Sequence, residues 1–372
     1  MSPRAWQAAV FAALLATAGC GVGIGGDDGQ PAGVARALPP APTFAAQSLE
    51  SAPEARDAGD AGDAGDAAPA GPALKIVTTV APLTSIVAAV AGARAEVHGL
   101  VPEGTNSHLF EPPPSAAKLL ADADVVFLNG LGLEDPTREL AAATMGRHAQ
   151  LVELGPAVLP ASDYIYDFSF PRSAGRPNPH LWTDPTYAIR YADKVRDVLV
   201  ELDPGARLVY DRNYDAFSRQ ATALSDALRA DQESVPGPKE LLTYHDAYAY
   251  FARTYGWTVV GAVQPRDFED PTPREIAALI DQVRAAAVPT IFGSEVFPSK
   301  ALEEIGKETG ARYEDTLRDD DLPGSPGEPD HSWLGLMRYD FMTMITGLGG
   351  RPDALATVDP TPAVADSADY PQ

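Results

Sequence analysis

Residues 74–92 read LKIVTTVAPLTSIVAAVAG, and this stretch decides the fold class. Its first seven residues are mostly aliphatic or β-branched, which is typical of a buried strand. Pro82 then begins an apolar run of helical length that closes at Gly92, the usual order of signals at the two ends of a helix. A buried strand followed at once by a helix is the repeating unit of α/β proteins with parallel sheets.

The same alternation continues along the chain. Further helical stretches lie at residues 273–287 and 300–309, and Gly310 closes the second. Further strand candidates lie at residues 95–101, 124–128, 150–154, 241–244, 258–263, 289–292 and 312–314. The predicted fold class is therefore α/β, with mostly parallel sheets.

One predicted helix is longer than the others. Asp203 and Pro204 are residue types that begin helices, and Pro236-Gly237-Pro238 ends the run. Between them an apolar stripe recurs at helical spacing: Tyr210, Tyr214, Phe217, Ala221, Leu224 and Leu228. We interpret residues 203–235 as a connecting helix between an N-terminal α/β lobe at residues 74–202 and a C-terminal α/β lobe at residues 236–350. An ordinary packed helix within one large domain is the alternative.

The first residues have the pattern of a targeting segment. An apolar stretch at residues 8–16 is too short to span a bilayer as a mature helix, and small residues then precede Cys20, the only cysteine. This resembles a bacterial lipobox, although Thr17 stands where Leu is preferred. It predicts a signal peptide at residues 1–19 and lipidation of Cys20, with an ordinary signal peptide as the alternative.

Two segments have the composition of unfolded chain. Residues 20–73 are dominated by Gly, Ala, Pro and Asp, and they contain the repeat DAGDAGDAGD, which matches neither an EF-hand loop nor the GGxGxD calcium-binding nonapeptide. They predict a lipid-anchored disordered linker. Residues 351–372 are predicted to form a flexible tail. No later stretch has the length of a transmembrane helix, so we expect an extracytoplasmic protein held to the membrane by lipid alone.

The chain is strongly acidic. It has 52 Asp and Glu residues against 28 Lys and Arg residues, a formal net charge of −24. Such a chain repels nucleic acid and anionic lipid, which excludes a nucleic-acid partner. The acidity either concentrates cations or simply keeps a secreted protein soluble.

Three of the six histidines stand in predicted loops or at strand ends: His108 in TNSHLFEPPP, His180 in PNPHLWTDP and His245 in LTYHDAYAYF. Their separations exclude a local zinc finger and suit a site built from separate loops. Neutral imidazole is a good ligand for zinc, and a carboxylate would complete a four-coordinate site. Asp315, just after the strand predicted at residues 312–314, is the candidate carboxylate. His98 and His148 are predicted to be structural or solvated.

The segments around these residues resemble the motifs of the metal-binding solute receptors of ABC transporters. Four carry the resemblance, in the order of the family: residues 107–134, NPHLWTDP at 178–185, YHDAYAYFARTYGW at 244–257 and YEDTL at 313–317. HSWLGLMRYD at 331–340 resembles the family's closing helix. Asn178 and Asp340 depart from the usual Asp and Asn, and Trp333 stands in place of Tyr.

The resemblance implies two α/β lobes joined by one long rigid helix, with a metal ion bound in the cleft between them. It assigns the ligand roles to His108, His180, His245 and Asp315. It also implies an ABC-importer permease as partner, and we expect a monomer. Zinc is the expected metal because manganese receptors of the family typically have Glu at the position of His245. Manganese is the alternative, since residues 129–179 hold only His148 and no His-rich loop.

A zinc hydrolase and a surface adhesin are the alternative classes of function. A zinc hydrolase keeps one coordination position open for water, whereas four protein ligands would fill the site, and HExxH does not occur. We therefore expect no enzymatic activity. A surface adhesin, a role described for some members of the family, has no separate support in the sequence.

Overall fold

The described residues form one compact unit. The computed structural model describes residues 73–264, 272–295 and 300–372, without the side chains of residues 286, 315 and 316. All of these residues fall within a single unit assigned to residues 66–372. The signal peptide, Cys20 and nearly all of the linker predicted up to residue 73 lie outside the described residues.

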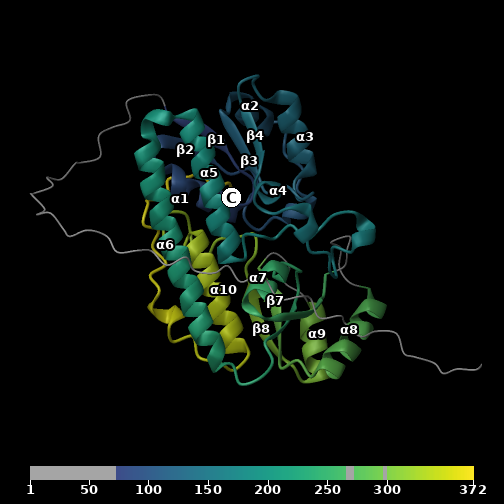
Figure 1. Cartoon of the computed structure of the whole chain (residues 1–372). Helices are drawn as coiled ribbons and strands as arrows, with labels where there is room; N and C mark the ends of the chain where they lie inside the picture. Colours follow the sequence, from purple (N-terminus) through teal and green to yellow (C-terminus); the bar gives the residue numbers. More distant parts are fainter. Residues whose placement is uncertain (1–72, 265–271, 296–299) are drawn as a thin grey trace, which may run out of the picture. The chain divides into compact units, whose positions relative to one another are not determined.

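Two parallel sheets organise this unit (Figure 1). The first has the order β2-β1-β3-β4 and consists of β1 (Leu74–Val77), β2 (Ala95–His98), β3 (Val125–Leu128) and β4 (Gln150–Glu153). The second has the order β6-β5-β7-β8 and consists of β5 (Glu240–Thr243), β6 (Thr258–Ala262), β7 (Thr290–Ser294) and β8 (Arg312–Leu317). All six strand pairings are parallel. The prediction of two α/β lobes is confirmed.

The helices follow the strands in alternation. The N-terminal lobe carries α1 (Ala81–Ala91), α2 (Ala116–Asp122), α3 (Asp135–Thr144), α4 (Leu154–Val158) and α5 (Pro185–Leu202). The C-terminal lobe carries α7 (Ala249–Tyr255), α8 (Pro273–Ala286), α9 (Lys300–Thr309) and α10 (Trp333–Gly347). The chain passes from one lobe to the other through α6 (Arg207–Asp231).

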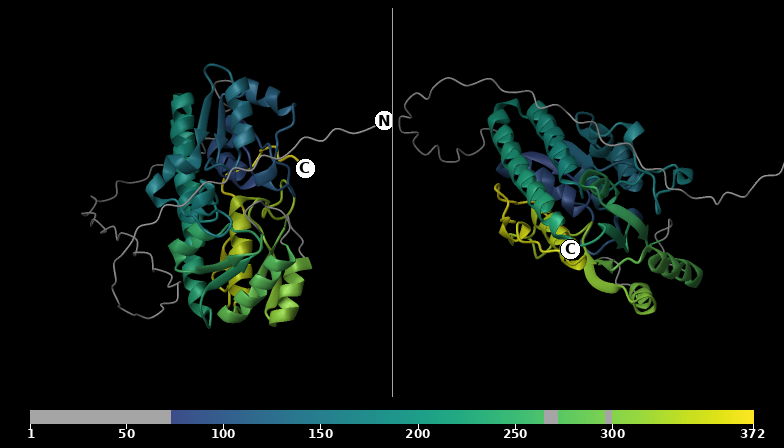
Figure 2. Two further views of the ribbon diagram at one scale, coloured as in Figure 1. Left: turned by 90° about the vertical axis from the view of Figure 1, so that its right-hand side faces the viewer. Right: turned by 60° about the horizontal axis from the view of Figure 1, so that its bottom comes forward.

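Helix α6 begins later than its sequence predicts. Pro204–Ala206 form a 3-10 turn, and the helix itself starts at Arg207. Asp203 occupies the N-cap position of the 3-10 turn, but its side chain makes no capping hydrogen bond, because the carboxylate accepts from Arg94 and from the Tyr210 hydroxyl. Helix α6 contacts α1, α5 and α10 (Figure 2). The predicted apolar stripe lies on this packed face, and its residues are buried except for the half-buried Tyr214.

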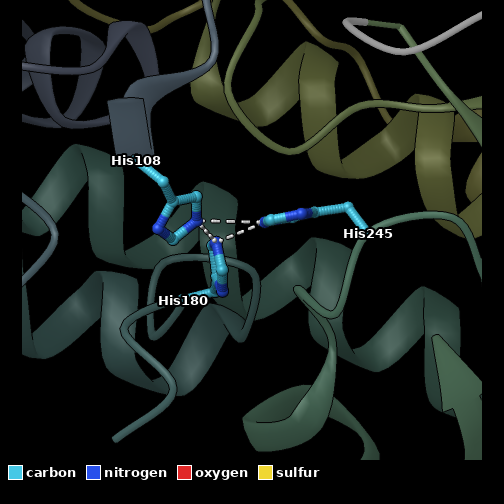
Figure 3. Close-up of side chains that lie close together, drawn as sticks. All are labelled: His108, His180 and His245. Carbon is cyan, nitrogen blue, oxygen red and sulfur yellow. Dashed lines mark hydrogen bonds between the residues drawn. The ribbon is translucent and has the colours of Figure 1, made fainter. Parts of the chain in front are cut away.

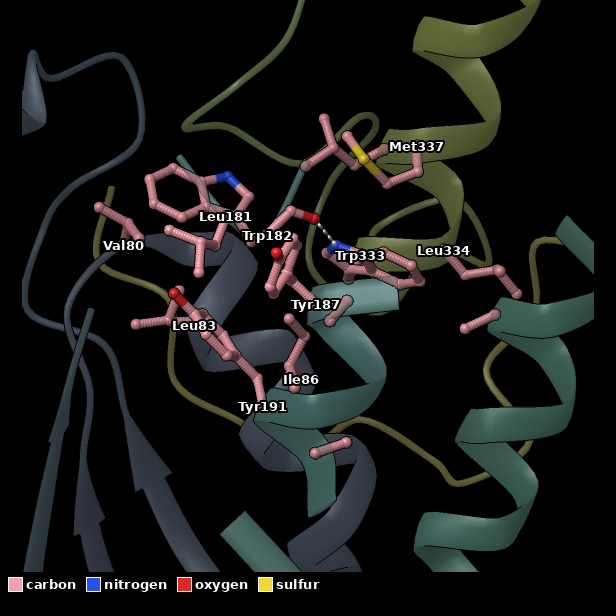
Figure 4. Close-up of a cluster of buried hydrophobic side chains, with 14 of the residues drawn as sticks. Val80, Leu83, Ile86, Leu181, Trp182, Tyr187, Tyr191, Trp333, Leu334 and Met337 are labelled. Atoms are coloured by element: carbon pink, nitrogen blue, oxygen red, sulfur yellow. Dashed lines mark hydrogen bonds between the residues drawn. The ribbon is translucent and has the colours of Figure 1, made fainter. Parts of the chain in front are cut away.

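A continuous apolar core joins elements of both lobes. One cluster of buried side chains includes Leu83 and Ile86 of α1, Tyr191 of α5 and Trp333 of α10 (Figure 4). The Trp333 indole N–H donates to the backbone oxygen of Trp182 at 2.9 Å, which fixes the start of α10 against the segment that precedes α5. Trp333, one of the departures from the family motif, thus fills a core position with its polar atom satisfied.

Residues 351–372 differ from the flexible tail predicted for them. This C-terminal strap packs along the unit: Asp369 forms a parallel bridge with His98 at the edge of β2, through backbone hydrogen bonds to Val97 and Gly99. Leu355 is fully buried, and Asp231 at the end of α6 accepts from its backbone N–H. The Pro-rich composition correctly predicted that the strap lacks regular secondary structure. The strap is nevertheless held in place, by isolated buried apolar side chains and by pairing with the edge of the first sheet.

Among the described residues, no helix is both long and apolar enough to cross a membrane.

Candidate metal centre

The topology places the histidines where parallel sheets bind ligands. In the second sheet the strand order reverses between β5 and β7, and His245 follows β5 by two residues at this switch point. His108 lies in a 3-10 turn (Ser107–Leu109) of the loop that follows β2. His180 lies in the segment that leads into α5. This helix begins at Pro185 and is capped by the side chain of Asp184.

The three rings meet at their Nε2 atoms (Figure 3). Nε2 of His180 lies 3.0 Å from that of His245, and Nε2 of His108 lies 3.2 Å from each of the other two. Within the described part of the chain, these residues form the one group of at least three His, Cys, Asp or Glu side chains close enough to share a metal ion. Ligand atoms 2.0–2.1 Å from a tetrahedral zinc lie about 3.3 Å apart, close to the spacing observed here.

The histidines are poised as neutral ligands. His180 is fully buried, and only 3% of His245 is exposed. Burial lowers the pKa of His245 to about 4 and holds the pKa values of His108 and His180 well below their usual range, with a further contribution from the neighbouring imidazoles. At neutral pH each ring therefore carries one proton and keeps one nitrogen lone pair for a metal.

Two side-chain amides contact the outer nitrogens of the rings. Nδ1 of His180 lies 2.9 Å from Oδ1 of Asn178, and Nδ1 of His245 contacts Oε1 of Gln264. Sequence reasoning recorded Asn178 only as a departure from the family motif, and it missed Gln264. Nothing local in the sequence marks Gln264, because it reaches His245 from the end of the neighbouring strand β6.

Aromatic rings enclose the cluster. Phe170 lies 5.5 Å from the ring of His108 and 5.6 Å from that of His180, and Trp182 lies 5.0 Å from His180, measured between ring centroids. Phe170 belongs to the segment between α4 and α5 and is 5% exposed. These rings limit the water around the imidazoles, which strengthens electrostatic interactions at the site.

A carboxylate that the sequence analysis did not select lies beside the cluster. Oδ2 of Asp319 is 3.4 Å from Nε2 of His245, and the side chain is almost fully buried. The Trp182 indole N–H donates to its backbone oxygen, which holds this residue near the histidines. The side chain of Asp315, the predicted ligand, lies outside the part that the structure describes. Three consecutive aspartates, Asp319–Asp321, follow β8, and this acidic run is the feature of the sequence that could have indicated a carboxylate near the histidines.

The segment around Asp319 is strongly acidic and buried. Glu295 accepts through one oxygen from the backbone N–H groups of Asp319, Asp320 and Asp321, and Asp321 accepts from Gly104 of the opposite lobe. Burial, followed by repulsion from Glu295, raises the pKa of Asp319 well above its usual range. A bound cation would relieve both effects.

The other described histidines lie away from the cluster. His98 contacts Asp369 of the strap, and His148 is exposed, in line with the structural and solvated roles expected for them. His331 pairs with Glu103 and packs against Tyr370.

Fold and site together define a class: a two-lobed binding protein with a nitrogen-rich cluster that could hold a transition-metal ion between its lobes. The model of the family described as zinc-uptake complex component A, periplasmic, matches residues 76–347. The chain belongs to this family, the metal-binding substrate-binding proteins of ABC transporters.

Individual relatives are named for different metals. The chain is 28% identical to the manganese-binding lipoprotein MntA of Halalkalibacterium halodurans over 279 residues, which cover 74% of this chain and 88% of MntA. It is 28% identical to the iron-binding protein YfeA of Yersinia pestis, over 74% of this chain and 86% of YfeA. The periplasmic zinc-binding protein TroA of Treponema pallidum has the same fold, with a TM-score of 0.67 at 22% identity over 74% of this chain and 99% of TroA.

Proposed function

We propose that this protein captures zinc outside the cytoplasm through His108, His180, His245 and one carboxylate, and delivers it to the permease of an ABC importer. The observation that carries the proposal is the convergence of three Nε2 atoms within 3.2 Å of one another, on the buried His180 and His245 and the partly buried His108. The rings come from both lobes, so one ion would bind to the two lobes at once. Membership of a family of substrate-binding proteins supports binding and release of the metal over catalysis.

Zinc is favoured over manganese by the donor set. Three imidazoles and one carboxylate suit a borderline metal such as zinc, whereas manganese prefers oxygen ligands. The relatives are named for manganese, iron and zinc, so the choice is a property of this chain's own ligands.

The experiment compares metal retention between variants. The metal-free protein is given equimolar zinc and manganese, desalted, and analysed for bound metal. We expect about one zinc per protein, removable by a chelator. Since zinc outcompetes manganese at most nitrogen and oxygen sites, the informative quantity is the shift caused by His245→Glu, which adds a hard oxygen ligand and should raise the retained share of manganese.

The exposed His148→Glu is the matched control, because it makes the same change of charge away from the cluster. It should leave the metal ratio unchanged. Retention of mostly manganese by the unmodified protein would refute the zinc assignment, and retention of neither metal would refute the receptor.

Two aspartates near the end of β8 are candidates for the carboxylate ligand. Family resemblance favours Asp315, and the 3.4 Å approach to His245 favours Asp319. Asp315→Ala and Asp319→Ala are therefore compared by zinc titration against a competing chelator. Loss of the carboxylate that binds the ion should weaken zinc binding by at least about tenfold, and loss of the other should change it much less.

Lipidation of Cys20 is the proposed anchor. The linker of about 50 residues is long enough to free the receptor from the membrane surface. Cys20→Ala should release the protein from membranes, while a truncated form that begins at Leu74 should still bind zinc. Unchanged membrane retention of Cys20→Ala would exclude this anchor.

A further inference from the structure

The orientation of the Asn178 side-chain amide is fixed by its partners. Its Oδ1 accepts from the backbone N–H of His180 at 3.0 Å, and a backbone N–H can only donate. Its Nδ2 donates to the backbone oxygen of Asp246 at 2.7 Å, and a backbone oxygen can only accept. Exchanging the oxygen and nitrogen of this amide would break both hydrogen bonds, so the assignment follows from chemistry.

The fixed amide decides the tautomer of His180. Oδ1 of Asn178 lies 2.9 Å from Nδ1 of His180, and an amide oxygen can only accept. Nδ1 must therefore carry the ring proton. A neutral imidazole has one such proton, so Nε2 of His180 is left with a bare lone pair that faces His108 and His245.

Gln264 makes the equivalent contact with His245. Its Oε1 meets Nδ1 of His245, and Nε2 of that ring faces the other two histidines. With Oε1 of Gln264 accepting from Nδ1–H of His245, the facing Nε2 atoms of His180 and His245, 3.0 Å apart, both lack a proton and cannot hydrogen bond to each other. Their approach is explained if both lone pairs point to the position of a cation.

We propose that Asn178 and Gln264 are positioning residues: their amide oxygens fix the Nδ1–H tautomers of His180 and His245 before the metal arrives, so that Nε2 of each ring is ready to bind it. The role of these tautomers in metal binding rests on the proposed function. The tautomers themselves do not, because they belong to the metal-free protein.

Asn178 also contacts a half-buried carboxylate, that of Asp167, and the backbone of the buried Asp246. Its Nδ2 donates to Oδ2 of Asp167 at 3.1 Å as well as to the backbone of Asp246. The amide thus holds the imidazole in place without bringing a carboxylate directly onto Nδ1. A carboxylate there would make the imidazole a stronger metal ligand, whereas the amide gives orientation with less added basicity.

The first test measures tautomers in the unmodified protein without metal. Long-range proton–nitrogen NMR spectra of the 15N-labelled protein above pH 7 distinguish the two ring nitrogens of each histidine. We expect the Nδ1–H form for His180 and His245, and the Nε2–H form, which free imidazole side chains prefer, for the exposed His148. Signals are assigned from single His→Ala variants. An Nε2–H form at His180 would overturn the proposal.

The second test changes the amide. Asn178→Ala removes the acceptor, and we expect His180 to lose its tautomer preference and zinc affinity to fall about 10–100-fold. N178D keeps an acceptor for Nδ1–H, and because a carboxylate also makes the imidazole a stronger ligand, it should restore both the tautomer and the affinity. Asn213→Ala is the matched control, because Asn213 is also buried and also donates to a backbone oxygen, that of Val90.

The outcomes separate the two proposals. Asn213→Ala should lower stability without changing zinc affinity or tautomers. Unchanged zinc affinity in Asn178→Ala, or loss of affinity equal to that of Asn213→Ala, would contradict the role of Asn178. If the unmodified protein bound no metal, the proposed function would fail, while the spectra of the metal-free protein would still decide the tautomers.

Discussion

Asp340 stands where the family motif has Asn, and its contacts with Tyr248 show how one proton can make the two residue types equivalent. The Tyr248 hydroxyl is central to these contacts. It lies 3.0 Å from the backbone oxygen of Arg318 and 2.9 Å from Oδ2 of Asp340. Oδ1 of Asp340 accepts from the backbone N–H of Arg318. The hydroxyl has one proton, and if the carbonyl accepts it, Oδ2 of Asp340 must supply the proton for the second hydrogen bond.

Asp340 can do this because burial raises its pKa well above the usual range. A protonated Asp offers one acceptor and one donor, the same pattern as the Asn that is usual at this position. The folded protein thus holds a proton that the unfolded chain releases above about pH 4. The free energy of unfolding therefore loses this contribution progressively as the pH rises above that value.

We predict that Asp340→Asn leaves the fold intact and is more stable than the parent at pH 8, by roughly 1–2 kcal/mol. The advantage should grow between pH 5 and pH 8, since Asn needs no proton. Urea unfolding of the metal-free protein, followed by circular dichroism across this range, measures it.

Asp226→Asn, on the exposed face of α6, is the control and should show no such trend. If the difference in free energy of unfolding between Asp340→Asn and the parent were the same at every pH, Asp340 would be ionised in the folded protein.

The sequence predicted that three histidines come together, as they do in the structure, but it did not predict the residues that contact them. His108, His180 and His245 stand in loops next to segments that resemble the motifs of a known family, and this resemblance, more than residue type or spacing, selected them. The partners Asn178 and Gln264, and the approach of Asp319 to His245, depend on distances set by tertiary packing. Such distances leave no local pattern.

At the scale of elements, all eight strands lie where the sequence places them. β3 and β7 are buried along their whole length, as expected for central strands of parallel sheets that are covered on both faces. The start of α6 was predicted too early, since Asp203 has two possible uses, as a helix cap or as a partner for Arg94, and only the packed structure decides between them. The C-terminal strap was missed because its contacts have no periodicity.

The strap leads to a prediction about Leu355, which is fully buried between α6 and α10. Leu355→Ala should lower the free energy of unfolding by about 2–4 kcal/mol, from lost burial and the cavity that remains. Urea unfolding of the metal-free protein measures the change.

Leu208→Ala is the matched control, because Leu208 is 82% exposed on α6. It should change stability by less than about 0.5 kcal/mol. Equal effects of the two substitutions would mean that the strap is detached in solution.

At the scale of the whole molecule, the lobes already touch around the histidines. Ser169 of the N-terminal lobe donates through its backbone N–H to Asp246 and through its hydroxyl to the backbone oxygen of Gln264. Asn178 adds a third hydrogen bond from the same lobe, to the backbone of Asp246. A metal held by rings from both sides would add to these links.

We therefore predict that zinc raises the melting temperature of the protein. A ligand that binds only the folded state stabilises it by about 2.7 kcal/mol at a free concentration one hundred times its dissociation constant. The rise, measured by differential scanning calorimetry, should shrink or vanish in His108→Ala, His180→Ala and His245→Ala.

His98→Ala and His148→Ala should respond to zinc like the parent. Loss of the zinc response in His98→Ala, equal to that in His180→Ala, would contradict the ligand assignment.

Trp182 lies where its fluorescence could report metal binding. Its indole lies against His180 and is hydrogen bonded to the segment that carries Asp319. Indole fluorescence responds to nearby charge, and a metal ion at the three histidines would place a positive charge close to the ring. Ultraviolet emission from this unlabelled side chain would therefore report occupancy, and stopped-flow mixing with metal or chelator would give the rates of loading and release.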